Sequence, residues 1–254
     1  MRVVALGTSA SYPGPGNACT GLLIQEEETN LLVDCGTGIL AKLQQVVPLT
    51  RVTAIVISHM HADHFLDLIP LRYAFRYGVA PSSSRPLIFL PPGGIAVLEH
   101  MAMPLDSKKT SDFFSSVFTI QEYDPGAPFL VGPLTVRFAS GNHYVPSWAI
   151  SVEGGRRVVF TSDTGPSDAV VALARGADLL VTEATYLSVD EERDSTRGHL
   201  TATEAGELAA LACPKRVLVT HLWPHRDAEV TLRKAKEVFQ GDIALAQEGR
   251  FYDV

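Results

Sequence analysis

The densest group of potential metal ligands in the chain is the segment Ser58-His59-Met60-His61-Ala62-Asp63-His64. It holds three imidazoles and one carboxylate within six residues, and it directly follows the apolar run Ala54–Ile57. Such groups are costly to bury without a partner, and a loop that leaves a strand can turn alternate side chains toward one point. A solvated polar turn is the alternative, but the position after a fully apolar strand favours a metal site.

Three further potential ligands follow predicted strands later in the chain. They are His143 after Leu134–Ala139, Asp163 after Val158–Thr161 and His221 after Val217–Thr220. A single histidine in such a place is more often structural than a ligand, but the shared position after strands favours one common site. The first segment and these residues together supply five histidines and two aspartates. This number is enough for two metal ions and too large for one tetrahedral site.

Short apolar runs that alternate with helical patterns are expected to position these side chains. The predicted strands are Val3–Leu6, Gly21–Ile24, Asn30–Val33, Ala54–Ile57, Leu87–Leu90, Leu134–Ala139, Trp148–Val152, Val158–Thr161, Leu179–Thr182, Val217–Thr220 and Ile243–Ala246. The predicted helices are Gly38–Val47, Leu66–Tyr77, Gly94–Met103, Asp168–Ala174, Thr201–Ala212 and Ala228–Phe239. No linker separates the two halves, so we predict one layered α/β domain over residues 1–254.

Composition and charge limit the classes of protein and partner. The 254 residues include 21 basic and 28 acidic side chains, which leave a formal net charge of −7. This balance disfavours a dedicated nucleic-acid binder, although it allows a local basic patch. No run reaches the roughly 18 apolar residues of a membrane-spanning helix, and the first run is too short for a signal sequence. We therefore expect no membrane association and a cytoplasmic location.

We also expect Cys19, Cys35 and Cys213 to be reduced packing residues.

The HxHxDH pattern of His59, His61, Asp63 and His64 resembles the signature of the metallo-β-lactamase superfamily. The resemblance runs from Gly7 to His221 and implies a four-layer αββα sandwich with the site at one edge. It also implies the ligands: the first metal takes His59, His61 and His143, the second takes Asp63, His64 and His221, and Asp163 bridges them. The expected cofactors are two Zn²⁺ ions, and Mn²⁺ also suits a set of nitrogen and oxygen ligands without thiolate.

Two later motifs resemble those of the ribonuclease Z group within this superfamily. They are Thr182-Glu183-Ala184-Thr185 and His199-Leu200-Thr201, and His143–Ser147 resembles that group's third motif. The resemblance implies a dyad of Glu183 and His199 beside the metals. A strand-end carboxylate and a helix cap are the alternative, with Thr201 at the cap and Glu204 closing a capping box. Both interpretations can hold at once.

The chain departs from ribonuclease Z between His143 and Asp163. That group generally carries a long glycine-rich and basic arm for transfer RNA at this place, whereas here the two residues are 20 positions apart, a length that a hairpin fills. The missing arm and the acidic charge favour a small phosphodiester as substrate. The layout is similar to the bacterial cyclic-nucleotide phosphodiesterases of this branch.

The predicted function is therefore metal-dependent hydrolysis of a small phosphodiester such as a 3′,5′-cyclic nucleotide. Two metals about 3.5–4 Å apart lower the pKa of a bridging water, and the resulting hydroxide is the expected nucleophile. Asp63 is expected to orient it and accept its proton, and His199, kept protonated by Glu183, to protonate the leaving oxygen. A ribonuclease Z-type endonuclease that processes transfer RNA 3′ ends, and a lactonase or thioesterase of the same superfamily, are the alternatives.

Four further expectations concern the surroundings of the site. Asp34 could accept the second N–H of a ligand imidazole, or instead form a turn with Gly36. The loop Gly7–Pro13 could bind phosphate through its backbone N–H groups, or simply connect two strands. The segment Leu66–Phe118 is expected to form one wall of the pocket. The family resemblance implies a homodimer through the helix Leu66–Tyr77.

Overall fold

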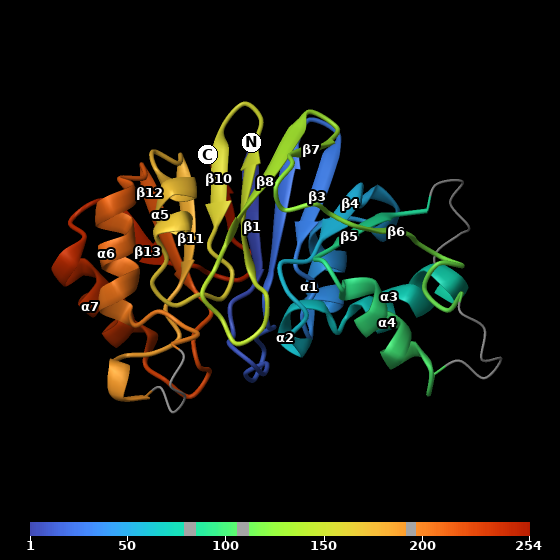
Figure 1. The fold of residues 1–254 in the computed structure, drawn as a ribbon, viewed down its shortest axis with the longest axis horizontal. Helices are drawn as coiled ribbons and strands as arrows, with labels where there is room; N and C mark the ends of the chain where they lie inside the picture. Colours follow the sequence, from blue (N-terminus) through green and yellow to red (C-terminus); the bar gives the residue numbers. More distant parts are fainter. Residues whose placement is uncertain (79–84, 106–111, 192–196) are drawn as a thin grey trace.

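The structure is a computed structural model that describes residues 1–78, 85–105, 112–191 and 197–254. Over these ranges the chain forms two mixed β-sheets that pack face to face, and helices cover the outer face of each sheet (Figure 1). The layers run in the order helix, sheet, sheet, helix. The α/β class and the four-layer sandwich expected from the sequence are confirmed.

The first sheet is built mainly from the N-terminal half of the chain. In spatial order its described strands are β14 (Phe251–Asp253), β1 (Arg2–Gly7), β2 (Gly21–Glu26), β3 (Thr29–Val33), β4 (Ala54–Val56), β5 (Leu87–Leu90) and β6 (Thr119–Glu122). Strands β3 to β6 are parallel, whereas β14, β1 and β2 pair antiparallel with their neighbours. Because β14 pairs with β1, the chain ends lie side by side, and the Val254 N–H donates to the Met1 carbonyl.

The second sheet comes from the C-terminal half. In spatial order its described strands are β13 (Ile243–Leu245), β12 (Arg216–Thr220), β11 (Leu179–Glu183), β10 (Arg157–Phe160), β9 (Trp148–Glu153), β8 (Leu134–Ser140) and β7 (Phe129–Val131). Strands β10 to β13 are parallel, and β7 to β10 form an antiparallel meander. The hairpin of β9 and β10 is the one expected between His143 and Asp163.

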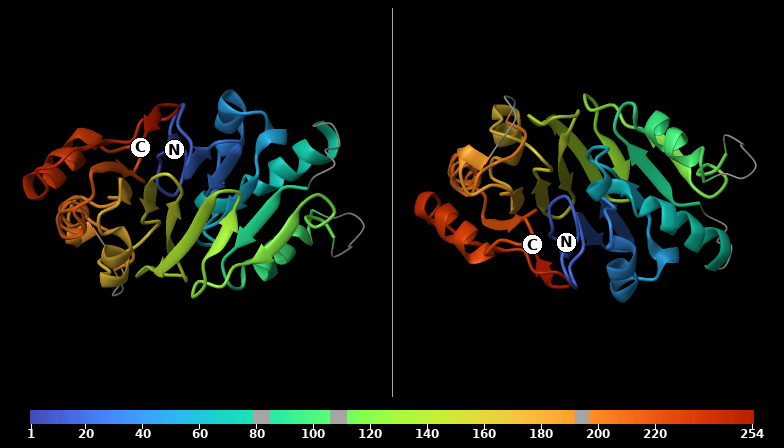
Figure 2. Two further views of the ribbon diagram at one scale, coloured as in Figure 1. Left: turned by 90° about the horizontal axis from the view of Figure 1, so that it is seen from above. Right: turned by 90° about the horizontal axis from the view of Figure 1, so that it is seen from below.

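Helices form the two outer layers (Figure 2). Those that cover the first sheet are α1 (Ile39–Val46), α3 (Leu68–Tyr73) and α4 (Gly94–Ala102). Those that cover the second sheet are α5 (Asp168–Ala174), α6 (Ala202–Ala212) and α7 (Ala228–Val238). The shorter helical segments are α2 (Ala62–Phe65), η1 (Leu49–Arg51), η2 (Ala74–Gly78) and η3 (Val189–Glu191). Within the described ranges, no helix combines the length and apolar composition needed to cross a membrane.

The apolar core has three layers, which explains the continuous apolar runs of the central strands. On β1, Val3 and Ala5 face the second sheet, whereas Val4 and Leu6 face the helices of the outer layer. Successive side chains of a strand point to opposite faces, so a strand covered on both sides must be apolar at every position. The strands β3, β4 and β11 are fully buried in the same way.

The elements differ from the expected ones at the sheet edges and in the helix after the ligand loop. Strands β6, β7 and β14 are short pieces at sheet edges with little apolar alternation, so the sequence pattern did not predict them. The helix expected over Leu66–Tyr77 is divided into α3 and the π-helical turn η2. It begins only at Leu68, because the Asp67 N–H donates to the Cys35 carbonyl and not to a carbonyl of the preceding helical turn. The Asp67 carboxylate also accepts hydrogen bonds from the Gly38 and Leu40 N–H groups at the start of α1. A homodimer through this helix stays a prediction.

The cysteines follow the expectation only in part. Cys19 and Cys35 are buried, but Cys213 is exposed, so the prediction that it is a packing residue was wrong. It is the C-cap of α6, with a left-handed φ of 49°. Its thiol donates to the Ala210 carbonyl at 3.2 Å and does not pack in the core.

The strands that precede the candidate ligands end at one edge of the sandwich. Strand β4 ends before His59, β8 before His143, β10 before Asp163 and β12 before His221. This edge is the lower one in Figure 1, where α2 lies. Ligand sites of α/β sheets form outside the carboxyl ends of parallel strands, and this edge meets that description.

Candidate metal centre

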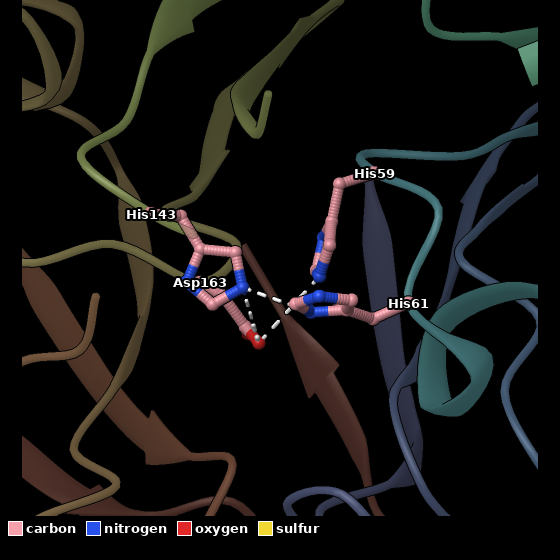
Figure 3. A group of neighbouring side chains, drawn as sticks. All are labelled: His59, His61, His143 and Asp163. Carbon is pink, nitrogen blue, oxygen red and sulfur yellow. Dashed lines mark hydrogen bonds and ion pairs between the residues drawn. The ribbon is translucent and has the colours of Figure 1, made fainter. Parts of the chain in front are cut away.

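Four of the predicted ligands form a first group at this edge. His59 and His61 lie in the loop after β4, and their rings face His143 and the Asp163 carboxylate from the opposite side (Figure 3). His61 Nδ1 is 3.0 Å from His143 Nε2, and His59 Nε2 is 3.7 Å from Asp163 Oδ2. One ligand atom of each residue lies within 4.8 Å of the others, which is close enough for all four to contact one ion.

A second group contains Asp63, His64, His221 and again Asp163. His64 Nε2 lies 3.3 Å from Asp163 Oδ2, while His221 Nε2 lies 3.4 Å from Asp163 Oδ1 and 3.3 Å from Asp63 Oδ2. Asp163 is thus the one residue that belongs to both groups. The structure brings all seven predicted ligands together and divides them as the family resemblance implies.

The short helix α2 explains how three of these ligands fit into one loop. His61 is the N-cap of α2 with an extended backbone, and Asp63 and His64 lie in its single turn. The change from extended to helical backbone separates His61, which faces the first group, from Asp63 and His64, which face the second. A straight strand would have placed His59, His61 and Asp63 on one face and His64 on the other.

The imidazole rings are held by hydrogen bonds at the nitrogen that faces away from the cluster. The Nδ1 partners are Ser58 Oγ at 3.1 Å for His59, Asp34 Oδ2 at 2.7 Å for His64, the Gly198 carbonyl at 2.6 Å for His143 and Thr185 Oγ1 at 2.9 Å for His221. Such partners fix the ring orientation and leave Nε2 as the ligand atom. His61 differs, because its Nδ1 faces the cluster.

Asp34 has the role expected of it rather than forming a turn with Gly36. It is fully buried, and besides His64 Nδ1 its carboxylate accepts the Ser58 N–H at 2.7 Å and the Ser58 hydroxyl at 2.8 Å. The Gly36 N–H instead donates to the Thr20 carbonyl. Asp34 therefore fixes both a candidate ligand and the start of the ligand loop.

We expect Asp34→Asn to weaken metal binding by about 10- to 100-fold, the usual effect of replacing a partner of a metal-bound histidine. Asparagine keeps the size of the side chain and tolerates the left-handed backbone at this position, where φ is 60°. The affinity of metal-free protein for zinc, measured by competition with a chelator, tests this. Asp124→Asn, at an exposed turn, is the control, and equal affinity in both variants would contradict the role of Asp34.

Backbone strain gathers around the same groups. Ser11, Asp34, Ser162 and His221 all have φ between 53° and 60°, a region that residues other than glycine seldom adopt. Each touches the cluster: His221 is a candidate ligand, and the other three hydrogen-bond to Asp63, His64 and His59 respectively. Such strain persists where the surrounding structure fixes it, typically at functional sites.

The buried donor atoms of the cluster fit a metal ion. Among the described residues, His59 Nε2, His64 Nε2 and Asp163 Oδ1 are buried and have no hydrogen-bond partner. Buried polar atoms of this kind are rare because leaving one unsatisfied costs about 1–3 kcal/mol. A cation within these groups would satisfy all three, so the His and Asp clusters can bind metal.

The charges of the clustered residues also favour metal binding. Burial alone would raise the pKa of Asp163, but His221 and His64 together hold it well below its usual range. Burial lowers the pKa of His64, but Asp163, Asp63 and Asp34 outweigh burial and raise it well above its usual value. The carboxylates are therefore ionised and attract positive charge. A metal ion that binds here replaces the proton on His64.

Glu183 and His199 form a hydrogen-bonded pair beside the metal ligands. His199 Nδ1 lies 3.0 Å from Glu183 Oε1, and the His199 ring centre is 4.8 Å from that of His143. Burial lowers the pKa of His199, but Glu183 more than offsets burial and raises the pKa to about 9. The protonated form of His199 is therefore favoured at neutral pH, and its Nδ1–H donates to Glu183.

The helix-cap interpretation of His199-Leu200-Thr201 holds at the same time. Thr201 is the N-cap of α6, its hydroxyl accepts the Glu204 N–H, and the Glu204 carboxylate accepts the Thr201 N–H. This capping box fixes the chain just after His199. The helix end therefore positions the histidine of the pair.

The loop Gly7–Pro13 does not offer the phosphate-binding N–H groups that were one expectation. The N–H groups of Thr8 and Ser9 donate to the Ala18 carbonyl, and those of Ala10 and Tyr12 donate to the carbonyls of Leu222 and Ala10. The Ser11 N–H donates to Asp63 Oδ2 at 2.7 Å, and Gly7 belongs to β1, where it pairs with Gly21 of β2. The loop connects two strands, and it also positions a candidate metal ligand.

Several residues that support the ligands were not anticipated from the sequence. Ser58 and Ser162 contact His59 Nδ1 through their hydroxyls, Thr185 contacts His221, and Ser11 contacts Asp63. Ser58 and Ser162 directly precede ligands in the chain, which is the one signal that could have identified them. Contacts across the fold, such as that of Ser11, have no sequence signal.

The pocket wall expected from Leu66–Phe118 stays a prediction. In the described part of this segment, α3 and α4 pack on the first sheet, and Met60 of the ligand loop packs against the same core cluster. The stretches 79–84 and 106–111 lie outside the described residues.

Comparison with known proteins places this geometry in a family. The model of the beta-lactamase superfamily domain matches residues 29–222. The probable metallo-hydrolase YhfI of Bacillus subtilis is 31% identical in sequence over 98% of both chains. Its crystal structure superposes on this one with a TM-score of 0.84 and 29% identity, and the superposition covers 99% of this chain and 98% of YhfI.

Ribonuclease Z proteins are also similar. That of Myxococcus xanthus is 27% identical over 98% of this chain and 96% of its own length. Human tRNase Z, short form, has the same fold, with a TM-score of 0.75 and 24% identity over 100% of this chain and 99% of that one. Together with the His and Asp clusters at the sheet edge, these findings identify the chain as a metal-dependent hydrolase of the beta-lactamase superfamily.

Proposed function

We propose that this protein is a phosphodiesterase that hydrolyses a small phosphodiester, such as a 3′,5′-cyclic nucleotide, with two metal ions, Zn²⁺ or Mn²⁺. The observation that carries the proposal is the Glu183–His199 pair beside two ligand groups that share Asp163. Two metals that share a bridging carboxylate suit phosphoryl transfer, and a protonated histidine beside them suits the release of a poor leaving group.

The ligand residues would hold the ions in the two groups described above. When bound, two such ions lower the pKa of water and stabilise negative charge on the phosphoryl group. Asp63 accepts the proton of the attacking water. The Ser11 N–H, which donates to Asp63 Oδ2, keeps this carboxylate in place.

His199 donates a proton from Nε2 to the leaving oxygen. Its Nδ1–H stays bonded to Glu183, which is fully buried and also accepts the Thr164 N–H at 2.6 Å. The buried carboxylate stabilises the charged form of the imidazole before the reaction and holds the ring throughout it. General acids of this kind contribute about 10²- to 10⁴-fold to the rate.

The relatives and the chain's own features favour different sizes of substrate. Two relatives named above are ribonucleases that the same site chemistry would serve, because cleavage of a cyclic nucleotide and of transfer RNA can both expel a 3′ oxygen. The short hairpin of β9 and β10 and the net charge of −7 support a small diester instead. RNA cleavage at a 3′ end is the second candidate function.

We expect the metal-loaded protein to hydrolyse bis(p-nitrophenyl) phosphate and to leave a simple lactone and a thioester unchanged. The two ligand groups that share Asp163 suit the charge that develops on a phosphoryl group, which neither a lactone nor a thioester contains. Parallel assays at equal enzyme concentration, each with and without a chelator, make the comparison. Faster turnover of the lactone or thioester, surviving His199→Ala, would overturn the phosphodiesterase proposal.

A further inference from the structure

The hydroxyl of Thr185 lies between a candidate metal ligand and the proposed acid pair. Thr185 follows β11, and only 2% of its surface is exposed. Its Oγ1 is 2.7 Å from Glu183 Oε2, 2.9 Å from His221 Nδ1 and 3.3 Å from His199 Nδ1. Glu183, His199 and His221 form a third group whose ligand atoms lie close together, and this hydroxyl is within hydrogen-bond distance of all three.

Counting protons fixes the direction of these hydrogen bonds. An ionised carboxylate only accepts, and a threonine hydroxyl has one proton to donate. Its acceptors within reach are Glu183 Oε2 at 2.7 Å and the His221 carbonyl at 3.2 Å, and the shorter distance and the negative charge favour donation to Glu183. The oxygen of Thr185 can then only accept from His221, whose Nδ1 must carry a proton. Nε2 of His221 is then the nitrogen that remains for a metal ion, and it faces Asp63 and Asp163.

We propose that Thr185 is a positioning residue that connects His221 to Glu183, so that one buried carboxylate orients both a metal ligand and the candidate acid. Glu183 Oε1 holds His199 directly, at 3.0 Å. Glu183 Oε2 holds His221 through the Thr185 hydroxyl and sets it in the tautomer that binds a metal. The role of the hydrogen bond from Glu183 to His199 rests on the proposed function. The connection from Glu183 through Thr185 to His221 depends only on metal binding.

The variants Thr185→Val and Thr185→Ser separate the hydroxyl from the shape of the side chain. Valine keeps the branched shape but leaves His221 Nδ1 and Glu183 Oε2 without their shared partner. Metal-free Thr185→Val is expected to bind zinc about 10- to 100-fold more weakly than the wild type, in competition with a chelator. Thr185→Ser retains the hydroxyl and is expected to bind zinc with nearly wild-type affinity.

Two controls exclude a general loss of structure. Thr231→Val replaces another buried threonine, on α7, and should leave zinc affinity unchanged. Thermal unfolding of the metal-free variants, followed by circular dichroism, checks that each is folded at the assay temperature. If Thr185→Val does not fold, the comparison of Thr185→Ser with Thr185→Ala gives the same contrast between hydroxyl and no hydroxyl.

A double-mutant cycle with Glu183→Gln tests the connection itself. If Thr185 acts through Glu183, the combined variant should lose little more zinc affinity than the worse single variant, because both remove the same chain of hydrogen bonds. Additive losses would overturn the connection. Wild-type zinc affinity in Thr185→Val, or equal losses in the valine and serine variants, would overturn the role of the hydroxyl. Because zinc affinity needs no substrate, a failure of the proposed function would appear separately, as absent diester turnover.

Discussion

Asp163→Ala is expected to abolish hydrolysis of every diester and to lower the metal content of the purified protein. Asp163 is the one residue shared by both ligand groups, and each of its carboxylate oxygens faces a histidine nitrogen at 3.3–3.4 Å. Metal ions contribute several kcal/mol to stabilising the transition state, and Asp163 would contact an ion in either group, so its loss should lower the rate by about 10³-fold or more. Elemental analysis and initial rates on the same preparation give both quantities.

Asp178→Ala is the matched control for that result. Asp178 is a carboxylate near the opposite end of β10 and β11, where it pairs with Lys215. Losing this surface pair should leave metal content and turnover unchanged. An Asp163→Ala protein that retained the full metal content of the control would show that this carboxylate does not bridge the two groups.

His199→Ala is expected to act selectively, according to the leaving group. Hydrolysis of an unactivated diester should fall by about 10²- to 10⁴-fold, the contribution of a general acid. Hydrolysis of bis(p-nitrophenyl) phosphate should change little, because p-nitrophenolate barely needs a proton. Burial lowers the pKa of His199, but Glu183 more than offsets burial and raises it, which favours the protonated form that this role requires. Rates on the two substrates under identical conditions give the ratio of the loss on the unactivated diester to the loss on bis(p-nitrophenyl) phosphate.

The ratio also separates a chemical role from a structural one. His100→Ala, at an exposed position on α4, should change neither rate. Metal analysis of His199→Ala should match the wild type, because His199 belongs to neither of the two groups that share Asp163. Equal losses on both diesters would mean that His199 supports the site without donating a proton.

The sequence predicts the layers of this fold because burial on both faces leaves a clear pattern. Strands such as Val3–Leu6 must be apolar throughout, and the helices that cover them carry apolar stripes. The edge strand Thr119–Glu122 escaped prediction because its mostly exposed side chains carry no such pattern. The break before Leu68 depends on the hydrogen bond from the Asp67 N–H to the Cys35 carbonyl, a contact between distant segments that no local pattern records.

The candidate metal ligands could be predicted from the sequence, but the residues that hold them in place could not. Metal ligands are restricted to a few residue types and cluster after strands, so His59 to His64 stand out in the sequence. Serine and threonine are common everywhere, and only the fold brings Thr185 to His221 or Ser11 to Asp63. The loop after β1 illustrates the limit: its composition allows a phosphate cradle, yet its N–H groups bind protein acceptors.

The most direct test of the account is turnover of 3′,5′-cyclic AMP by purified protein loaded with zinc or manganese, beside an unprocessed transfer RNA precursor under the same conditions. We predict that the cyclic nucleotide is hydrolysed, that a chelator abolishes the reaction, and that the RNA is not cut. Cleavage of the RNA alone, at its 3′ end, would contradict the small-diester proposal and show that a surface other than an arm between His143 and Asp163 holds the RNA.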